Sequence, residues 1–207
     1  MAEMKHGDRP SRKFRHAVRM TRQHMPSGLP AGFFLTDPVR TPDPVSTIRG
    51  LPVGVGVIFR HFGQEPALSK APDIVRLCQR QNRTILVGAD MELAIAIGAD
   101  GVHWPARLAH KIPESVRHVR LNTLSVHSVT ELQRARTVGA DAILVSAVYP
   151  SESPSAGAPI GPGRLRSLAR TAGRPVYALG GITCDNVERI ARTSGFAAIS
   201  GLKEAAG

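Results

Sequence analysis

The sequence predicts an α/β fold, a (β/α)₈ (TIM) barrel that forms one compact domain behind a basic N-terminal extension. Short runs of Val, Ile and Leu alternate with helical patterns, which indicates a parallel sheet covered by helices. Eight strand–helix pairs can be counted, and eight parallel strands close a barrel. No G-x-G-x-x-G motif follows the first strand, which disfavours an open dinucleotide-binding sheet. We therefore expect residues 1–30 to form the extension and residues 31–207 to form the barrel.

The first half of the barrel is expected where short apolar runs meet turn residues or polar side chains. The strands cover 33–36, 53–59, 84–87 and 100–104. Apolar residues recur at helical spacing between these strands, which predicts helices over 44–49, 66–79 and 91–97. The stretch 105–116 carries only a loop and a weak helix.

The second half repeats the same unit. Strands are expected over 119–126, 142–148, 176–179 and 196–200, and helices over 128–138, 164–171, 186–190 and after Gly201. Ser128 and Glu131 form a capping-box pattern at the start of their helix. Gly-Ala-Asp occurs at 98–100 and again at 139–141, where a helix ends and a strand begins, as a repeated β/α unit requires.

The composition indicates to which broad class of protein the chain belongs. The chain of 207 residues, 42% of them hydrophobic, has no apolar run of about 18 residues and no apolar core of a secretory signal near its start. Cys78 and Cys184 have neither metal-ligand spacing nor the pattern of a disulfide framework. We therefore expect a reduced, cytoplasmic protein without a membrane partner.

The formal net charge is +11, and much of it lies in the first 25 residues, from Lys5 to Arg22. A basic arm can bind nucleic acid, but this one has almost no aromatic interleaving and no binding motif. A solvated extension, or a short helix covering the barrel floor, is the preferred interpretation, and nucleic acid is not expected as a partner. The remaining positive charge is compatible with a phosphorylated small-molecule substrate.

A phosphate site is expected at the ends of strands seven and eight. Gly180-Gly181 ends one strand and Ile199-Ser200 ends the next, and each turn leads into a helix whose first amides are free. Barrels of this class bind phosphate at these two turns. The alternative is that the glycines only make tight turns.

Other candidates follow the carboxyl ends of further strands. Arg60 offers a guanidinium fork for a phosphate or carboxylate, with a surface ion pair as the alternative. His127 follows strand five beside Ser125, where an imidazole can move protons or only cap and pack. Ser151 and Ser153 lie in a Pro/Ser/Gly-rich loop that is either a lid over an anion or a plain surface loop. No metal-ligand pair can be discerned.

Five segments, taken in this order, resemble the thiamine phosphate synthase / thiazole tautomerase family. They are residues 94–103, 124–128, 139–141, 148–151 and 178–183. The resemblance covers roughly residues 33 to 202 and implies a (β/α)₈ barrel that holds a thiazole phosphate at the glycine turn and the last strand end. It implies Ser125 as a further contact to the substrate and a homodimer as a possible assembly.

The synthase branch implies magnesium, which stabilises the pyrophosphate that leaves a pyrimidine diphosphate. The chain departs from that pattern at the matching positions: Phe62 stands for a lysine, Gly88-Ala89-Asp90 for Asn-Asp-Arg, Leu108 for an aspartate, and Ser151, Ser153 and Pro154 for the lid's threonines and lysine. Both magnesium carboxylates are therefore missing, unless the displaced Asp90 substitutes. Because neutralising a leaving pyrophosphate is worth several kcal/mol, this loss weighs against the synthase reaction.

The tautomerase branch implies no cofactor and a histidine base after strand five, which His127 matches. The leading hypothesis is therefore a thiazole tautomerase with His127 as proton shuttle. The alternatives are a divergent synthase that joins thiazole phosphate to the pyrimidine diphosphate, and a binder of thiazole or thiamine phosphate without catalysis.

Overall fold

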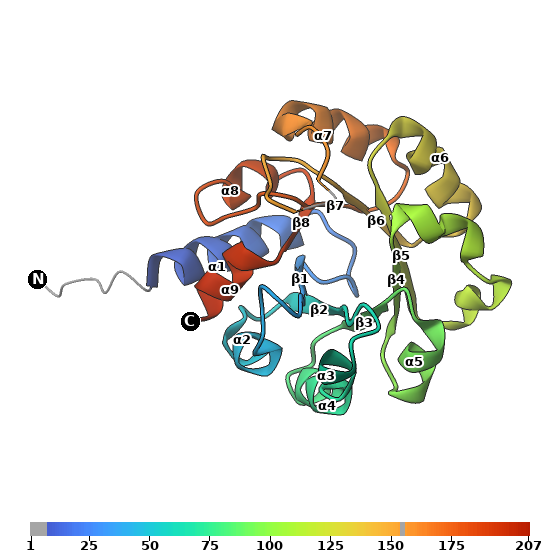
Figure 1. Cartoon of the computed structure of the whole chain (residues 1–207). Coiled ribbons are helices and arrows are strands. Elements are labelled where there is room, and N and C mark those ends of the chain that lie inside the picture. Colours follow the sequence, from blue (N-terminus) through green and yellow to red (C-terminus); the bar gives the residue numbers. More distant parts are fainter. Residues whose placement is uncertain (1–7, 154–155) are drawn as a thin grey trace, which may run out of the picture.

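The eight strands close into a parallel barrel in chain order, with the helices in a ring around it (Figure 1). This computed structural model describes residues 8–153 and 156–207, so Lys5 and Pro154 lie outside the described residues. The strands are β1 Gly32–Leu35, β2 Val55–Phe59, β3 Ile85–Gly88, β4 Gly101–Trp104, β5 Leu121–Val126, β6 Ala142–Val145, β7 Val176–Ala178 and β8 Gly195–Ala198. Pairing of Gly32 with both Val55 and Phe196 joins β1 to β2 and to β8, which closes the barrel and confirms the predicted fold class.

The helices follow the strands. They are α1 Asp8–Arg22, α2 Pro44–Gly50, α3 Glu65–Leu68, α4 Ala71–Arg80, α5 Met91–Ala96, α6 Val129–Thr137, α7 Gly161–Thr171, α8 Val187–Ile190 and α9 Ser200–Ala206, with the 3₁₀ helices η1 Ala106–Lys111 and η2 Glu114–His118. None of the described helices is long and apolar enough to cross a membrane.

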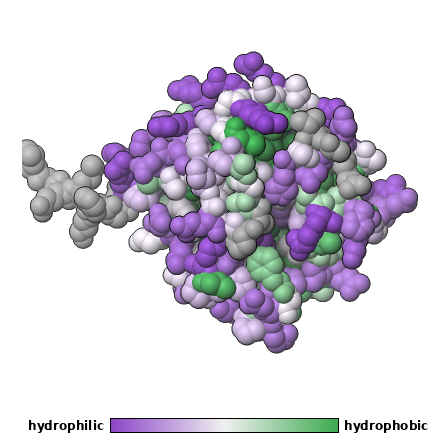
Figure 2. All heavy atoms as spheres, turned by 45° about the horizontal axis from the view of Figure 1, so that its top comes forward, coloured by the Kyte–Doolittle hydropathy of each residue, from purple (hydrophilic) through white to green (hydrophobic). Residues whose placement is uncertain are grey.

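Two apolar cores stabilise the barrel. One fills its interior, with Phe33, Ile58, Leu86 and Tyr177 among its buried side chains. The other lies between the sheet and the helices. Strand residues alternate between the two because successive side chains of a strand point to opposite faces. The face of the molecule shown in Figure 2 is mainly hydrophilic, with hydrophobic residues in a few separate patches.

Helix α1 lies in the outer ring, beside α8 and α9 (Figure 1). Its Phe14 is fully buried, and the Phe14 ring centroid lies 5.5 Å from that of Phe196 in β8. The segment that follows α1 reaches the barrel floor, where Met25 and Leu29 pack against the interior core. Because α8 has only four residues, α1 supplies much of the apolar cover over this part of the sheet.

Two predicted helices differ from the structure. The expected helix over 66–79 is broken into α3 and α4 at Ser69 and Lys70, since Pro72 lacks an amide hydrogen and favours a new helix start. The weak helix over 105–116 is two 3₁₀ helices instead.

Candidate functional site

A cavity of about 770 Å³ lies at the carboxyl ends of five strands. Its described walls come from the loops after β1, β2, β6, β7 and β8. Seven of the predicted site residues line it: Arg60, Ser151, Ser153, Gly180, Gly181, Ile199 and Ser200. Ser125 and His127, both from the β5 side, are not among its lining residues.

The loops after β7 and β8 present free amides to this cavity. In the described part of the chain, the backbone N–H groups of Gly180, Gly181, Ser200 and Gly201 donate no hydrogen bond to another residue. Gly181 has φ of +64°, and a Cβ there would lie 2.2 Å from the carbonyl oxygen of Pro150. A residue without a side chain is therefore required both by the turn and by the close approach of the β6 loop. The arrangement leaves several donors for one anion.

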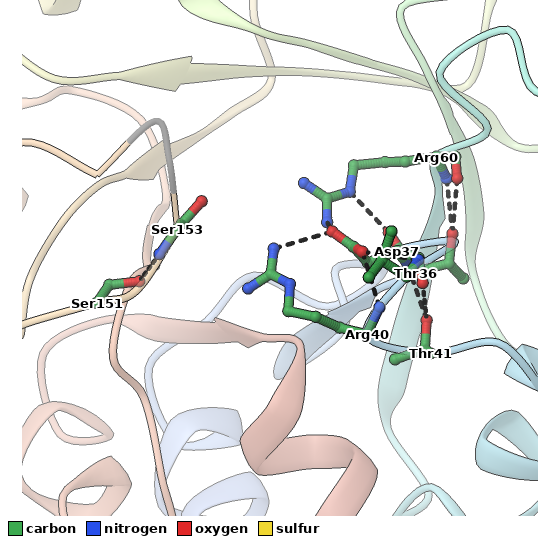
Figure 3. A network of polar contacts seen from close by, with 8 residues as sticks. Thr36, Asp37, Arg40, Thr41, Arg60, Ser151 and Ser153 are labelled. Carbon is green, nitrogen blue, oxygen red and sulfur yellow. Dashed lines mark hydrogen bonds and ion pairs between the residues drawn. The ribbon is translucent and has the colours of Figure 1, made fainter.

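Asp37, Arg40 and Arg60 form a charged cluster on the β1–β2 side of the cavity, which we call the arginine clamp (Figure 3). The Asp37 Oδ2 atom lies 2.9 Å from the Arg40 Nη2 atom and 3.3 Å from the Arg60 Nη2 atom. Arg60 also donates from Nε to the carbonyl of Thr36 at 2.8 Å. Both guanidinium groups extend toward the side of the cavity bordered by Ser151 and Ser153 (Figure 3).

The electrostatics of the clamp follow from its burial and its charges. Burial acts to raise the pKa of Asp37, but hydrogen bonds from Arg40 and the charges of Arg40 and Arg60 hold it below its usual value. Burial lowers the pKa of Arg60 to about 10, with Asp37 opposing and Arg40 adding to the shift. At neutral pH the clamp therefore carries two positive charges and one negative charge.

Ser125 lies in the barrel interior below the cavity. Its Oγ atom is 3.0 Å from Nε2 of His103, whose Nδ1 atom is 2.9 Å from Oγ1 of Thr123. Complete burial, and then the charge of Arg60, lower the pKa of His103 to about 3. His103 is therefore a neutral imidazole between two hydroxyl groups, and Ser125 is its hydrogen-bond partner.

His127 lies at a separate, small cavity of about 90 Å³ whose walls come from β5, β6, α7 and the start of α6. Its Nδ1 atom is 2.9 Å from the carbonyl oxygen of Ser146, and its backbone N–H donates to Glu131. The predicted base thus borders a different cavity from Gly180, Gly181 and Ser200, although Ser146, whose carbonyl oxygen it contacts, also lines the larger cavity.

The residues present do not fit a magnesium ion. Asp90 accepts from the amide of Leu93 as the N-cap of α5 and lies 3.4 Å from Nε2 of His61, and it is not a lining residue of the larger cavity. Leu108 packs against the outer core. The carboxylates that do line that cavity are Asp37, whose oxygens already accept from the clamp, and the exposed Glu152 and Glu204. Across the described residues no three His, Cys, Asp or Glu side chains gather as a cation would require.

Sequence reasoning missed Arg40. A signal was present, because Asp37 ends the first strand and Arg40 follows three residues later, a spacing at which side chains meet in a turn. The structure shows that contact, together with an amide hydrogen bond from Arg40 to Asp37 at 3.0 Å.

Comparisons with known proteins identify the family of the chain. A family model described as thiamine monophosphate synthase matches residues 53–202. A thiamine-phosphate synthase of Lactococcus lactis is 32% identical over 155 residues, which cover 72% of this chain and 70% of that protein. A thiamine-phosphate synthase of Geobacillus thermodenitrificans is 37% identical over 145 residues, 65% of this chain and only 63% of that protein's length.

A solved structure shares the fold. Thiamine phosphate pyrophosphorylase from Pyrococcus furiosus superposes with a TM-score of 0.67 at 21% identity, covering 84% of this chain and 92% of that one. The family match spans well over half of the chain and confirms the resemblance found in the sequence. The chain belongs to the thiamine monophosphate synthase family.

Proposed function

We propose that this chain is a transferase of the synthase type that binds a phosphorylated thiazole in the larger cavity. The observation that carries the proposal is the set of four free amides from Gly180, Gly181, Ser200 and Gly201 on one wall of that cavity. Such amides bind a phosphate monoester through hydrogen bonds that need no side chain. Relatives of the family named thiamine-phosphate synthase support the reaction class.

In this reaction the thiazole ring attacks the methylene carbon of a pyrimidine diphosphate, the carbon–oxygen bond to the diphosphate breaks, and pyrophosphate leaves with the bonding electrons. The amides hold the thiazole phosphate and so orient the ring. The arginine clamp faces the same cavity and supplies positive charge near a leaving anion.

The experiment is to incubate the protein with both substrates and to detect thiamine phosphate by mass spectrometry. We expect product with the wild type and loss of thiazole phosphate binding in Gly201→Ala, because a Cβ at this position would lie 2.4 Å from the carbonyl oxygen of Ile182. Binding that Gly201→Ala leaves unchanged would contradict the proposed phosphate site.

A second candidate is a binder of the same ligand without turnover. The missing carboxylate set favours it, since the family's reaction is implied to use magnesium at that position. Thiazole phosphate would then raise the melting temperature while both substrates together gave no product.

The tautomerase hypothesis has less support, because His127 borders the small cavity and not the one with the free amides. Its test is the His127→Ala variant. If the wild type has tautomerase activity and the His127→Ala variant loses it, the tautomerase hypothesis would be supported.

A further inference from the structure

The arginine clamp has more positive charge than the residues around it neutralise. Both guanidinium groups contact the same oxygen of Asp37, so one carboxylate faces two cations. Glu152 and Glu204, the other described carboxylates on the cavity wall, are not within ion-pair distance of either arginine. One unit of positive charge is left toward the cavity.

The clamp is also prepared to donate hydrogen bonds. The Nη1 atoms of Arg40 and Arg60 have no acceptor among the described residues, although Nη2 of each and Nε of Arg60 do. The side chains are 34% and 20% exposed, so they are reachable from the cavity. Two guanidinium forks side by side match the oxygens of phosphate groups.

The clamp is held in position before any ligand binds. Asp37 accepts from the amides of Val39 and Arg40, and Thr41 closes the same turn through its hydroxyl. Lys203 of α9 donates to the carbonyl oxygen of Arg40 at 3.0 Å. The Phe62 ring lies against the Arg60 guanidinium, 5.1 Å from its central carbon. A preorganised donor set loses little conformational entropy on binding.

We propose that the arginine clamp replaces a divalent cation in this cavity, so that a pyrophosphate group binds to the two guanidinium groups with no metal ion between it and the protein. Arg40, on the β1–α2 loop, supplies the charge that the absent carboxylate–metal set would otherwise provide. A phosphate monoester occupies the amides after β7 and β8, while the pyrophosphate occupies the clamp after β1 and β2. The inference rests on the proposed function only in that both ligands share one cavity.

The test is calorimetric titration of the full chain with inorganic pyrophosphate in buffer containing EDTA, repeated with magnesium. We expect binding in EDTA, and a loss of affinity of roughly tenfold or more in Arg40→Gln. Arg40→Lys, which keeps the charge and removes the fork, is expected to bind with intermediate affinity. Arg49→Gln, at an exposed arginine of α2, is the matched control and should bind like the wild type.

Three results would overturn the inference: no pyrophosphate binding by the wild type, binding that appears only with magnesium, or an Arg40→Gln variant that binds as tightly as the wild type with an unchanged melting temperature.

The failure of this inference can be distinguished from the failure of the proposed function. Gly201→Ala should lose thiazole phosphate and keep pyrophosphate, and adding Arg40→Gln to it should remove pyrophosphate as well. Pyrophosphate binding lost in Gly201→Ala alone and unaffected by Arg40→Gln would assign the anion to the amides and reject the clamp.

Discussion

His103 is a buried titratable group whose two ring nitrogens both have partners within the barrel. Its imidazole hydrogen-bonds the hydroxyls of Thr123 and Ser125 inside the barrel, and all three residues are buried. Because burial and the charge of Arg60 disfavour the imidazolium, the folded protein keeps His103 neutral far below the pKa of an exposed histidine.

This depressed pKa predicts acid sensitivity. Below about pH 6 the unfolded chain takes up a proton at His103 and the folded chain does not, until the pH approaches the folded pKa of about 3. The contribution of His103 to stability is therefore full above that range and falls by about 1.4 kcal/mol per pH unit as the pH is lowered. Urea unfolding at a series of pH values measures the slope. His103→Gln should flatten it by that amount, and an unchanged slope would contradict the assignment.

Two aspartate–arginine pairs at the same spacing give a matched test of the clamp. Asp37 pairs with Arg40 at 13% exposure of the carboxylate side chain, whereas Asp73 pairs with Arg76 at 65%. Asp37→Asn should cost about 1–3 kcal/mol of unfolding free energy, because two arginines lose a charged acceptor in a partly buried site. Asp73→Asn should change it by less than about 1 kcal/mol. Equal losses in urea unfolding would show that the clamp is an ordinary surface pair.

At the scale of elements, the strands were predictable because a parallel strand covered on both faces needs a continuous apolar run, and few other segments of this chain have one. Their polar ends were less predictable. Ser125 and His127 are two residues apart, and alternation along a strand would put both on one face. The strand ends at Val126, so His127 is free to leave that face and contact Ser146.

Helix α1 is predicted to be essential to the barrel. Phe14→Ala should lower the free energy of unfolding by about 3–5 kcal/mol, since it empties a fully buried site between α1 and β8. Arg19→Ala, at an exposed position of the same helix, should have a small effect. Thermal or urea unfolding distinguishes the two. Similar stability of the Phe14 variant and the wild type would mean that α1 is a dispensable extension.

The contact between the β6 and β7 loops gives a further prediction. Gly181→Ala introduces a Cβ close to Pro150 at a positive φ and should cost about 1–3 kcal/mol or displace the loop. Gly157→Ala, in the loop after β6 and with nothing within 4 Å of the new Cβ, should be nearly neutral. Unfolding curves measure the loss of stability in each variant, and limited proteolysis of the loop after β6 reports whether that loop is displaced. Equal behaviour of the two variants would contradict the close contact.

At the scale of the whole molecule, the larger cavity is bordered by only some of the strand ends of the barrel. Its described walls come from the ends of β1, β2, β6, β7 and β8, and no residue of β5 is among its lining residues. The sequence predicts a phosphate site at the amides after β7 and β8 because barrels of this class often place one there. The sequence does not predict which strand ends border the cavity, because this depends on loop contacts such as Asp37 with Arg40 and Gly181 with Pro150.

The most direct measurement is a crystal structure of the protein with a phosphorylated thiazole and pyrophosphate, grown in EDTA. We predict phosphate density within hydrogen-bond distance of the amides of Gly180, Gly181, Ser200 and Gly201, and a second anion between Arg40 and Arg60. Phosphate density at the small cavity beside His127, with the larger cavity holding solvent alone, would contradict the account.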